Sequence, residues 1–194
     1  MHGFILTEVQ QFVESIADKQ TWYAILDRAG LPDADFHNFL EYPDEQVVAI
    51  VGAASEVTGL SPAEVLERYG VFLGKDLFQI YRPIIDPAWR TIEFLEGIEQ
   101  TIHRVVRSRN RRARPPGLVC ERTGPEEVTI VYTSPRRLCA LARGLVLGVA
   151  EHYGEALEIA EDRCMHRGDA ECRIRVRRLE AGTPPTVPAE EESR

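Results

Sequence analysis

The sequence predicts an α+β fold, with a helical first half and a β-β-α-β-β second half. Apolar residues recur at helical spacing up to about residue 110, and two pairs of β-rich runs follow, each around a turn signal. We expect one domain of residues 1–180. A helical sub-part (1–60) packs on a second part (61–180) that holds an antiparallel sheet and a helix, and a Pro- and Glu-rich tail (181–194) is disordered.

Turn and cap residues divide the first half into helices. Gly30 is expected to stop the second helix and Gly59 to cap the third. Ser61, Pro62 and Glu64 form a capping box that opens the fourth. The expected segments are 4–19, 21–32, 43–59, 61–81 and, from an Asp-Pro pair, one long helix at 86–110.

The second half alternates hairpins with one helix. Residues 115–134 are two β-rich runs around a Gly-Pro turn, and residues 155–179 are two runs around Arg-Gly-Asp. Between them, residues 135–154 are expected to be a helix that begins at Pro135 and ends at Gly154.

Composition excludes several classes of protein. A net charge of -8 argues against a dedicated nucleic-acid binder. No apolar run approaches the roughly 20 residues of a membrane helix, and no signal-peptide pattern is found, so we expect a cytoplasmic protein that engages neither nucleic acid nor membrane. The four cysteines are then thiols or metal ligands. No nucleophile–base arrangement or phosphate loop stands out, so we expect no enzyme.

Two polar features have both a structural and a functional interpretation. His103 lies late in the long helix beside an apolar stripe, as a structural histidine or as a metal ligand, for example to a haem iron. Tyr132, Ser134 and Arg136 alternate where a strand gives way to a helix. They form an ordinary capped helix start, or a donor cluster for two carboxylates such as haem propionates.

Cysteines, glycines and arginines form three further patterns. Cys139, Cys164 and Cys172 with His166 make a Cys₃His set, which is a closed zinc site or a group of buried thiols. Gly70 and Gly74 in one helix are tolerated there, or they allow close approach to something flat or bulky. The six arginines within 104–114 are a solvated helix end or an interaction surface, without the aromatic residues of a nucleic-acid site.

The opening "MHGFIL", the helix with His103, the "PP" shortly after it and the Tyr-x-Ser-x-Arg motif resemble the H-NOX (haem nitric oxide/oxygen binding) family. This is the sensor domain of soluble guanylate cyclase and its bacterial relatives, and the resemblance spans residues 1–179. It implies a b-type haem between the two sub-parts. His103 would be the proximal ligand of a five-coordinate ferrous iron, and Tyr132, Ser134 and Arg136 would bind the propionates.

The resemblance also implies the rest of the haem pocket and its ligands. Pro115 or Pro116 would press on the haem and distort it, and four residues would line or pack on its distal side: Ile5, Val9, Gly74 and Phe78. Leu141 stands where oxygen-binding members carry a distal tyrosine. An apolar pocket that lacks this donor is expected to bind NO and CO and to exclude O₂.

Some bacterial members carry zinc, and Cys139, Cys164 and Cys172 match their ligand positions. Glu161 replaces the histidine of those members, so either Glu161 or His166 would be the fourth ligand. The signal would pass to a separate protein, such as a histidine kinase or a cyclic-di-GMP enzyme. The alternative is a haem-free small-molecule binding or dimerisation module with a structural zinc site.

Overall fold

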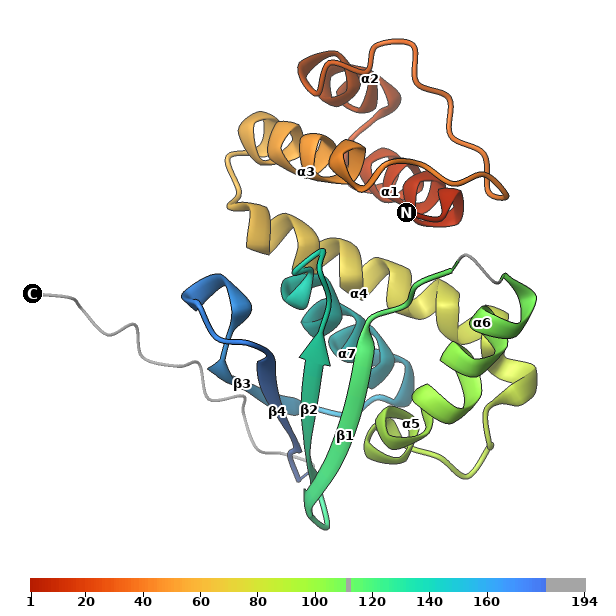
Figure 1. Ribbon diagram of the computed structural model, residues 1–194, viewed down its shortest axis with the longest axis vertical. Helices are drawn as coiled ribbons and strands as arrows, with labels where there is room; N and C mark the ends of the chain where they lie inside the picture. Colours follow the sequence, from red (N-terminus) through yellow and green to blue (C-terminus); the bar gives the residue numbers. More distant parts are fainter. Residues whose placement is uncertain (111–112, 181–194) are drawn as a thin grey trace, which may run out of the picture.

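The computed structural model describes residues 1–110 and 113–180, so the predicted tail lies outside the described residues. Its elements confirm the predicted α+β order (Figure 1). The helices are α1 (Gly3–Ile16), α2 (Lys19–Arg28), α3 (Asp44–Thr58), α4 (Pro62–Tyr81), α5 (Thr91–Gly97), α6 (Arg104–Arg109) and α7 (Cys139–Tyr153). The strands are β1 (Gly117–Gly124), β2 (Glu127–Thr133), β3 (Leu157–Arg163) and β4 (Cys172–Arg178). Short 3₁₀ turns lie at Arg82–Ile84 and Met165–Arg167, and a π-helix lies at Glu99–His103.

Local signals explain where several helices begin and end. The Ser61 hydroxyl accepts a hydrogen bond from the Glu64 N–H, and the Glu64 carboxylate accepts one from the Ser61 N–H, which confirms the capping box. Gly59 and Gly154 end α3 and α7 with φ of 73° and 67°, a left-handed geometry that favours glycine.

Two predicted helix starts are wrong. The long helix begins at Thr91 rather than at the Asp-Pro pair, because the Asp86 carboxylate accepts a hydrogen bond from the Ala88 N–H and holds a turn there. The helix α7 begins at Cys139, not at Pro135. Ser134 instead accepts a hydrogen bond from the Arg136 N–H, and Arg137 takes a φ of 51°, which no helix can continue.

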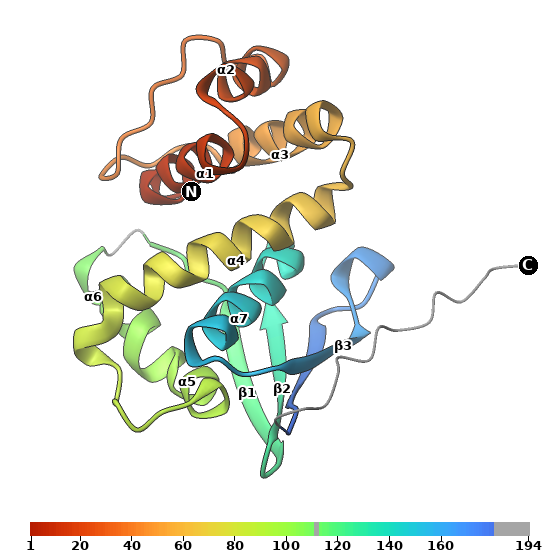
Figure 2. The same ribbon diagram turned by 180° about the vertical axis from the view of Figure 1, so that it is seen from behind.

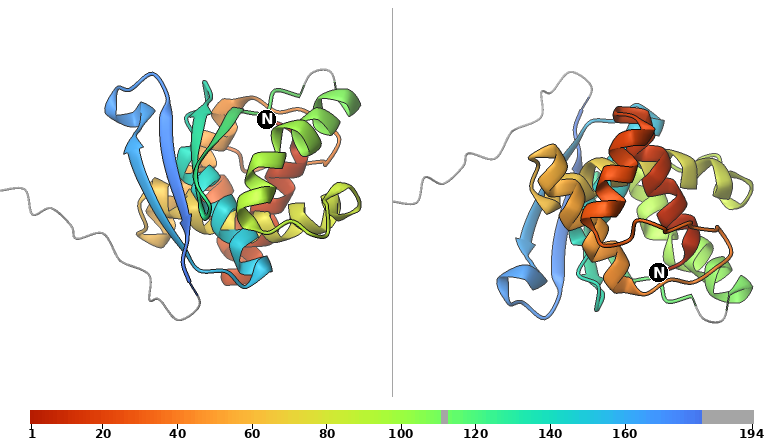
Figure 3. Two further views of the ribbon diagram at one scale, coloured as in Figure 1. Left: turned by 90° about the horizontal axis from the view of Figure 1, so that it is seen from below. Right: turned by 90° about the horizontal axis from the view of Figure 1, so that it is seen from above.

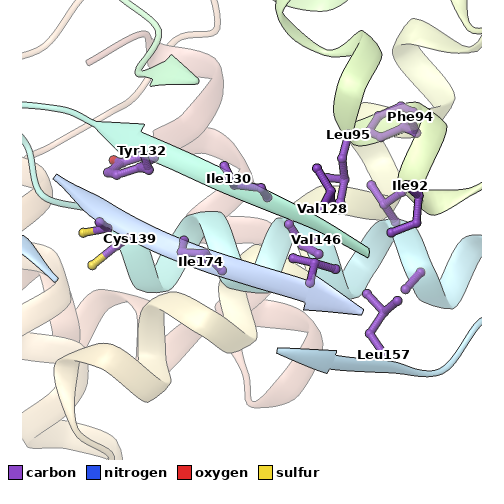
Figure 4. Close-up of a cluster of buried hydrophobic side chains, with 14 of the residues drawn as sticks. Ile92, Phe94, Leu95, Val128, Ile130, Tyr132, Cys139, Val146, Leu157 and Ile174 are labelled. Atoms are coloured by element: carbon purple, nitrogen blue, oxygen red, sulfur yellow. The ribbon is translucent and has the colours of Figure 1, made fainter. Parts of the chain in front are cut away.

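The sheet is antiparallel with strand order β1-β2-β4-β3. One face packs on α7, and alternate residues of the central strands point to it (Figure 4). These inward residues are Val128, Ile130 and Tyr132 of β2 and Cys172, Ile174 and Val176 of β4. All six are buried, so the two central strands and α7 form the middle of one core.

Two hydrophobic cores meet along α4. The amino-terminal core combines α1–α3 with Val65, Tyr69 and Leu73 from the first half of α4. Phe78, near the end of α4, belongs to the second core with α5, α7 and the sheet. Seen from behind, α1–α3 lie above α4 and the sheet lies below it (Figure 2), and in the view from above α1–α3 lie in front of the rest (Figure 3). The predicted division at residue 60 falls at the start of a helix that serves both cores.

The helices α4 and α7 touch backbone to backbone. Gly70 and Gly74 of α4 face Gly144 and Gly148 of α7, and a Cβ added at Gly148 would lie 2.5 Å from the Val71 carbonyl oxygen. A Cβ at Gly144 would come closer than 3.0 Å to the carbonyl oxygen of Glu67. The bulky object that Gly70 and Gly74 approach is therefore helix α7.

Candidate functional site

An apolar cavity lies where α4 and α7 face the helical run 91–109 and the first two strands. Its volume is about 170 Å³. The residues that line it are almost all apolar: Gly74, Leu77, Phe78, Tyr81, Phe94, Leu95, Ile98, Ile102, His103, Pro116, Leu118, Cys120, Ile130, Ala142, Leu145, Val146 and Val149. A pocket of this kind suits a large apolar ligand that needs few polar contacts.

His103 is the nitrogen ligand that this cavity offers. Its side chain is 13% exposed, and its Nδ1 lies 2.8 Å from Oε2 of Glu99. Burial lowers the pKa of His103, while the Glu99 carboxylate raises it. Because a carboxylate only accepts hydrogen bonds, the pairing assigns the proton to Nδ1 and leaves the lone pair on Nε2, the state that a metal ligand requires.

The segment that carries His103 is not a regular α-helix. The His103 N–H donates to the carbonyl oxygen of Ile98 at 3.0 Å, a bond that spans five residues instead of four. Wide turns of this type occur frequently at functional sites. The described run 91–109 therefore contains one extra residue where His103 enters the cavity.

The structure brings only some of the predicted pocket residues to the cavity. Gly74, Phe78, His103 and Pro116 line it. Three residues expected there pack elsewhere: Ile5, Val9 and Leu141 border the amino-terminal core. Pro115 and the donor cluster of Tyr132, Ser134 and Arg136 do not line the cavity either.

Two members of the donor cluster, Tyr132 and Ser134, contact each other at the end of β2. The Tyr132 hydroxyl hydrogen-bonds with the Ser134 side chain, and burial raises the pKa of Tyr132. Arg136 donates from Nε to Oδ2 of Asp44 at 2.8 Å and from a terminal nitrogen to the Arg114 carbonyl at 2.8 Å. Arg136 thus already holds one carboxylate, that of Asp44.

Sequence reasoning missed Glu99, which contacts His103, and two polar residues that line the cavity, Tyr81 and Cys120. Glu99 precedes His103 by four residues, a spacing at which helical side chains meet, so it could have been found. Tyr81 and Cys120 enter the cavity through the packing of α4 and β1, which no local signal indicates. Burial raises the pKa of Cys120 to about 11, so its thiol stays protonated at neutral pH.

Comparison with known proteins gives this geometry a context. The sequence matches the Haem-NO-binding family over residues 2–161. The chain belongs to the Haem-NO-binding (H-NOX) family. This is a family of haem-based gas sensors. No curated protein matches the chain.

Solved structures of H-NOX proteins share the fold. One from S. oneidensis in the Fe(II)NO state has a TM-score of 0.86 at 23% identity and covers 93% of this chain and 100% of its own. The unliganded Fe(II) protein from K. algicida has a TM-score of 0.83 at 22% identity and covers 95% and 100%. The Shewanella oneidensis domain in the Fe(II)CO state has a TM-score of 0.82 at 23% identity and covers 92% and 99%.

The residues of this H-NOX chain fit a haem. The cavity is apolar and holds a histidine whose tautomer leaves Nε2 for iron. The described part of the chain contains no helix with the length and apolar character needed to cross a membrane.

A second group of possible metal ligands comes from the start of α7, from β3 and the residue after it, and from β4. One ligand atom from each of Cys139, Glu161, Cys164 and Cys172 lies within 4.8 Å of the other three. Oε1 of Glu161 is buried and lacks a hydrogen-bond partner among the described residues, and burial raises the pKa of Cys139. His166 points elsewhere, with Nε2 2.7 Å from the Arg137 carbonyl. The chemistry of these four residues suits a metal ion, and the group includes Glu161 and not His166.

Proposed function

We propose that the protein senses NO and CO through a b-type haem held by His103, and that it passes the signal to a separate protein. His103, which lines an apolar cavity and pairs through Nδ1 with Glu99, carries this proposal. A bound ferrous haem, held by His103, would supply an iron that binds the gas. A histidine kinase or a cyclic-di-GMP enzyme is the class of partner that the resemblance implies.

Residues from two parts of the chain would hold the haem. His103 would hold the iron from the helical run 91–109, and the donor cluster of Tyr132, Ser134 and Arg136 would bind the propionates, with Arg136 exchanging the Asp44 carboxylate for one of them. Release of His103 would free the run 91–109 against α4 and α7. A gas that weakens the iron–histidine bond would thereby shift the population of two arrangements.

Exclusion of O₂ is the finer part of this proposal. Leu141 lies beside the amino-terminal core with Ile5 and Val9, and none of the three has a hydrogen-bond donor in its side chain. Bound O₂ takes on negative charge and gains from a donor, which NO and CO need much less. Among the residues that line the cavity, Tyr81 carries a hydroxyl group that could donate a hydrogen bond to O₂. If an oxygen complex forms, Tyr81→Phe tests whether this hydroxyl stabilises it.

Absorption spectra of the reduced protein test the sensor function. The wild type is expected to show a five-coordinate ferrous haem spectrum that changes with NO and with CO and shows no stable oxygen complex in air. His103→Ala should lose this spectrum, whereas His152→Ala, an exposed histidine outside the cavity, should keep it. A wild type that takes up no haem on supplementation would support the haem-free binding or dimerisation module instead.

We propose that Cys139, Glu161, Cys164 and Cys172 hold a structural zinc ion. Purified protein should contain about one zinc per chain, and Cys172→Ser should lower the metal content because it removes a fully buried ligand. Glu161→Gln should lower it too, while His166→Gln should not. Equal zinc in all four proteins, measured by atomic emission, would contradict this site.

A further inference from the structure

Glu99 is bound by two partners at once, and each of its oxygens has its own. Oε2 lies 2.8 Å from Nδ1 of His103, and Oε1 accepts from a terminal nitrogen of Arg107 at 2.6 Å. The side chain of Glu99 is 31% exposed and that of Arg107 is 44% exposed, so the chain His103–Glu99–Arg107 runs from the cavity to the surface. Arg107 belongs to the basic run noted in the sequence.

A carboxylate on the outer nitrogen of a histidine alters the inner nitrogen. It fixes the ring orientation and the tautomer, and it makes the imidazole a stronger electron donor to a metal on Nε2. A cation on the same carboxylate acts in the opposite sense, because it draws negative charge away from the histidine. The two partners of Glu99 therefore oppose each other in their effect on His103.

We propose that Glu99 is a positioning residue that sets the strength of the bond between His103 and the haem iron, and that Arg107 attenuates it. The proposal rests on the proposed function and deepens it. A strong iron–histidine bond resists the release that NO produces, so the Glu99–Arg107 pair sets how readily the helical run 91–109 is freed.

The iron–histidine stretching frequency of the reduced protein, measured by resonance Raman spectroscopy, tests the proposal. Glu99→Gln keeps the size of the side chain and an acceptor for Nδ1 but removes the charge, so the frequency should fall. Arg107→Gln should raise it, because Glu99 then interacts with His103 alone. Glu99→Leu should weaken haem retention by about 10-fold or more, the usual effect of losing such a partner of a metal ligand.

Glu96→Gln is the matched control. Glu96 is a carboxylate of α5 that pairs with Arg122 at 2.7 Å, so its loss removes an ion pair of the same kind away from His103. The frequency should not move in this variant. A Glu99→Gln shift no larger than the Glu96→Gln shift, or Arg107→Gln and Glu99→Gln shifts of the same sign, would overturn the proposal.

The outcomes separate this inference from the sensor function. If the wild type shows no iron–histidine band, or shows a band that His103→Ala retains, the assignment of His103 fails. If the band is present and depends on His103 but ignores Glu99 and Arg107, only the role of the pair fails. The fraction of the NO complex that is five-coordinate gives a second readout, expected to rise in Glu99→Gln and to fall in Arg107→Gln.

Discussion

Gly144→Ala is expected to destabilise the protein by at least about 3 kcal/mol, the upper part of the range for overpacked cores. The added Cβ would lie closer than 3.0 Å to the carbonyl oxygen of Glu67 and to the Cα of Gly70. Both are backbone atoms of α4, so no side chain can rotate away and the two helices must separate. This is a large part of the 5–15 kcal/mol that holds a typical domain together.

Gly52→Ala is the matched control for this substitution. Gly52 lies inside α3, and a Cβ there meets no atom within 4 Å. Alanine at that position is expected to stabilise the helix by up to about 1 kcal/mol. Urea unfolding of the three proteins measures both effects. A Gly144→Ala protein as stable as the wild type would show that α4 and α7 do not meet through their backbones.

Glu8→Gln is expected to stabilise the folded protein at pH 8 by up to about 3 kcal/mol, from the size of its pKa shift. Glu8 of α1 is only 6% exposed. One oxygen accepts from Gln11 at 3.0 Å, and the other finds no donor among the described residues. Burial, and then the facing carboxyl of Asp76 on α4, raise the pKa of Glu8 from 4.5 to about 7.

The sign of the pH dependence follows from this raised pKa. Below pH 4.5 the carboxyl is protonated in the folded and unfolded states, so it does not change stability. Between pH 4.5 and about 7 the folded state binds more protons, so stability falls as pH rises, and above about 7 the full cost remains.

Urea unfolding at pH 4 and pH 8 measures the difference between Glu8→Gln and the wild type. We expect near equality at pH 4 and the full gain at pH 8. Glu14→Gln on the same helix, where the carboxylate accepts from Gln10 at 2.8 Å, should show no such gain. An equal gain in stability in both variants would contradict this prediction, because it would show that the net charge of α1, and not the burial of Glu8, causes the gain.

Signals that act within a few residues predicted several helix ends correctly. The capping box of Ser61 and Glu64 and the glycine ends of α3 and α7 are all local, and the structure has them. The start of α7 was missed because Ser134 and Pro135 form the pattern of a cap but fold as a turn. The left-handed Arg137 that follows depends on packing, and nothing in its residue type indicates it.

In the candidate sites too, a local sequence pattern could place some residues, whereas others depend on packing. Glu161 alternates with Leu157 and Ile159 along β3, and this period of two would have placed it on the inner face with the cysteines. His166, which sits in the 3₁₀ turn, has no such constraint and turns outward. The cavity itself was beyond local reasoning, because its wall depends on how closely α4 approaches α7.

Because of the wide turn at residues 99–103, the helical run that carries His103 has two alternative hydrogen-bonding registers. Its backbone stays bonded by a hydrogen bond from the His103 N–H to the Ile98 carbonyl, and a regular α-helical turn would bond that N–H one residue later in the chain. Trading one turn for the other is a step of one whole residue, about 100° of rotation and about 1.5 Å along the axis. If the helical run keeps its backbone hydrogen bonds, it changes between two discrete registers. The arginines of α6 would rotate together with the run.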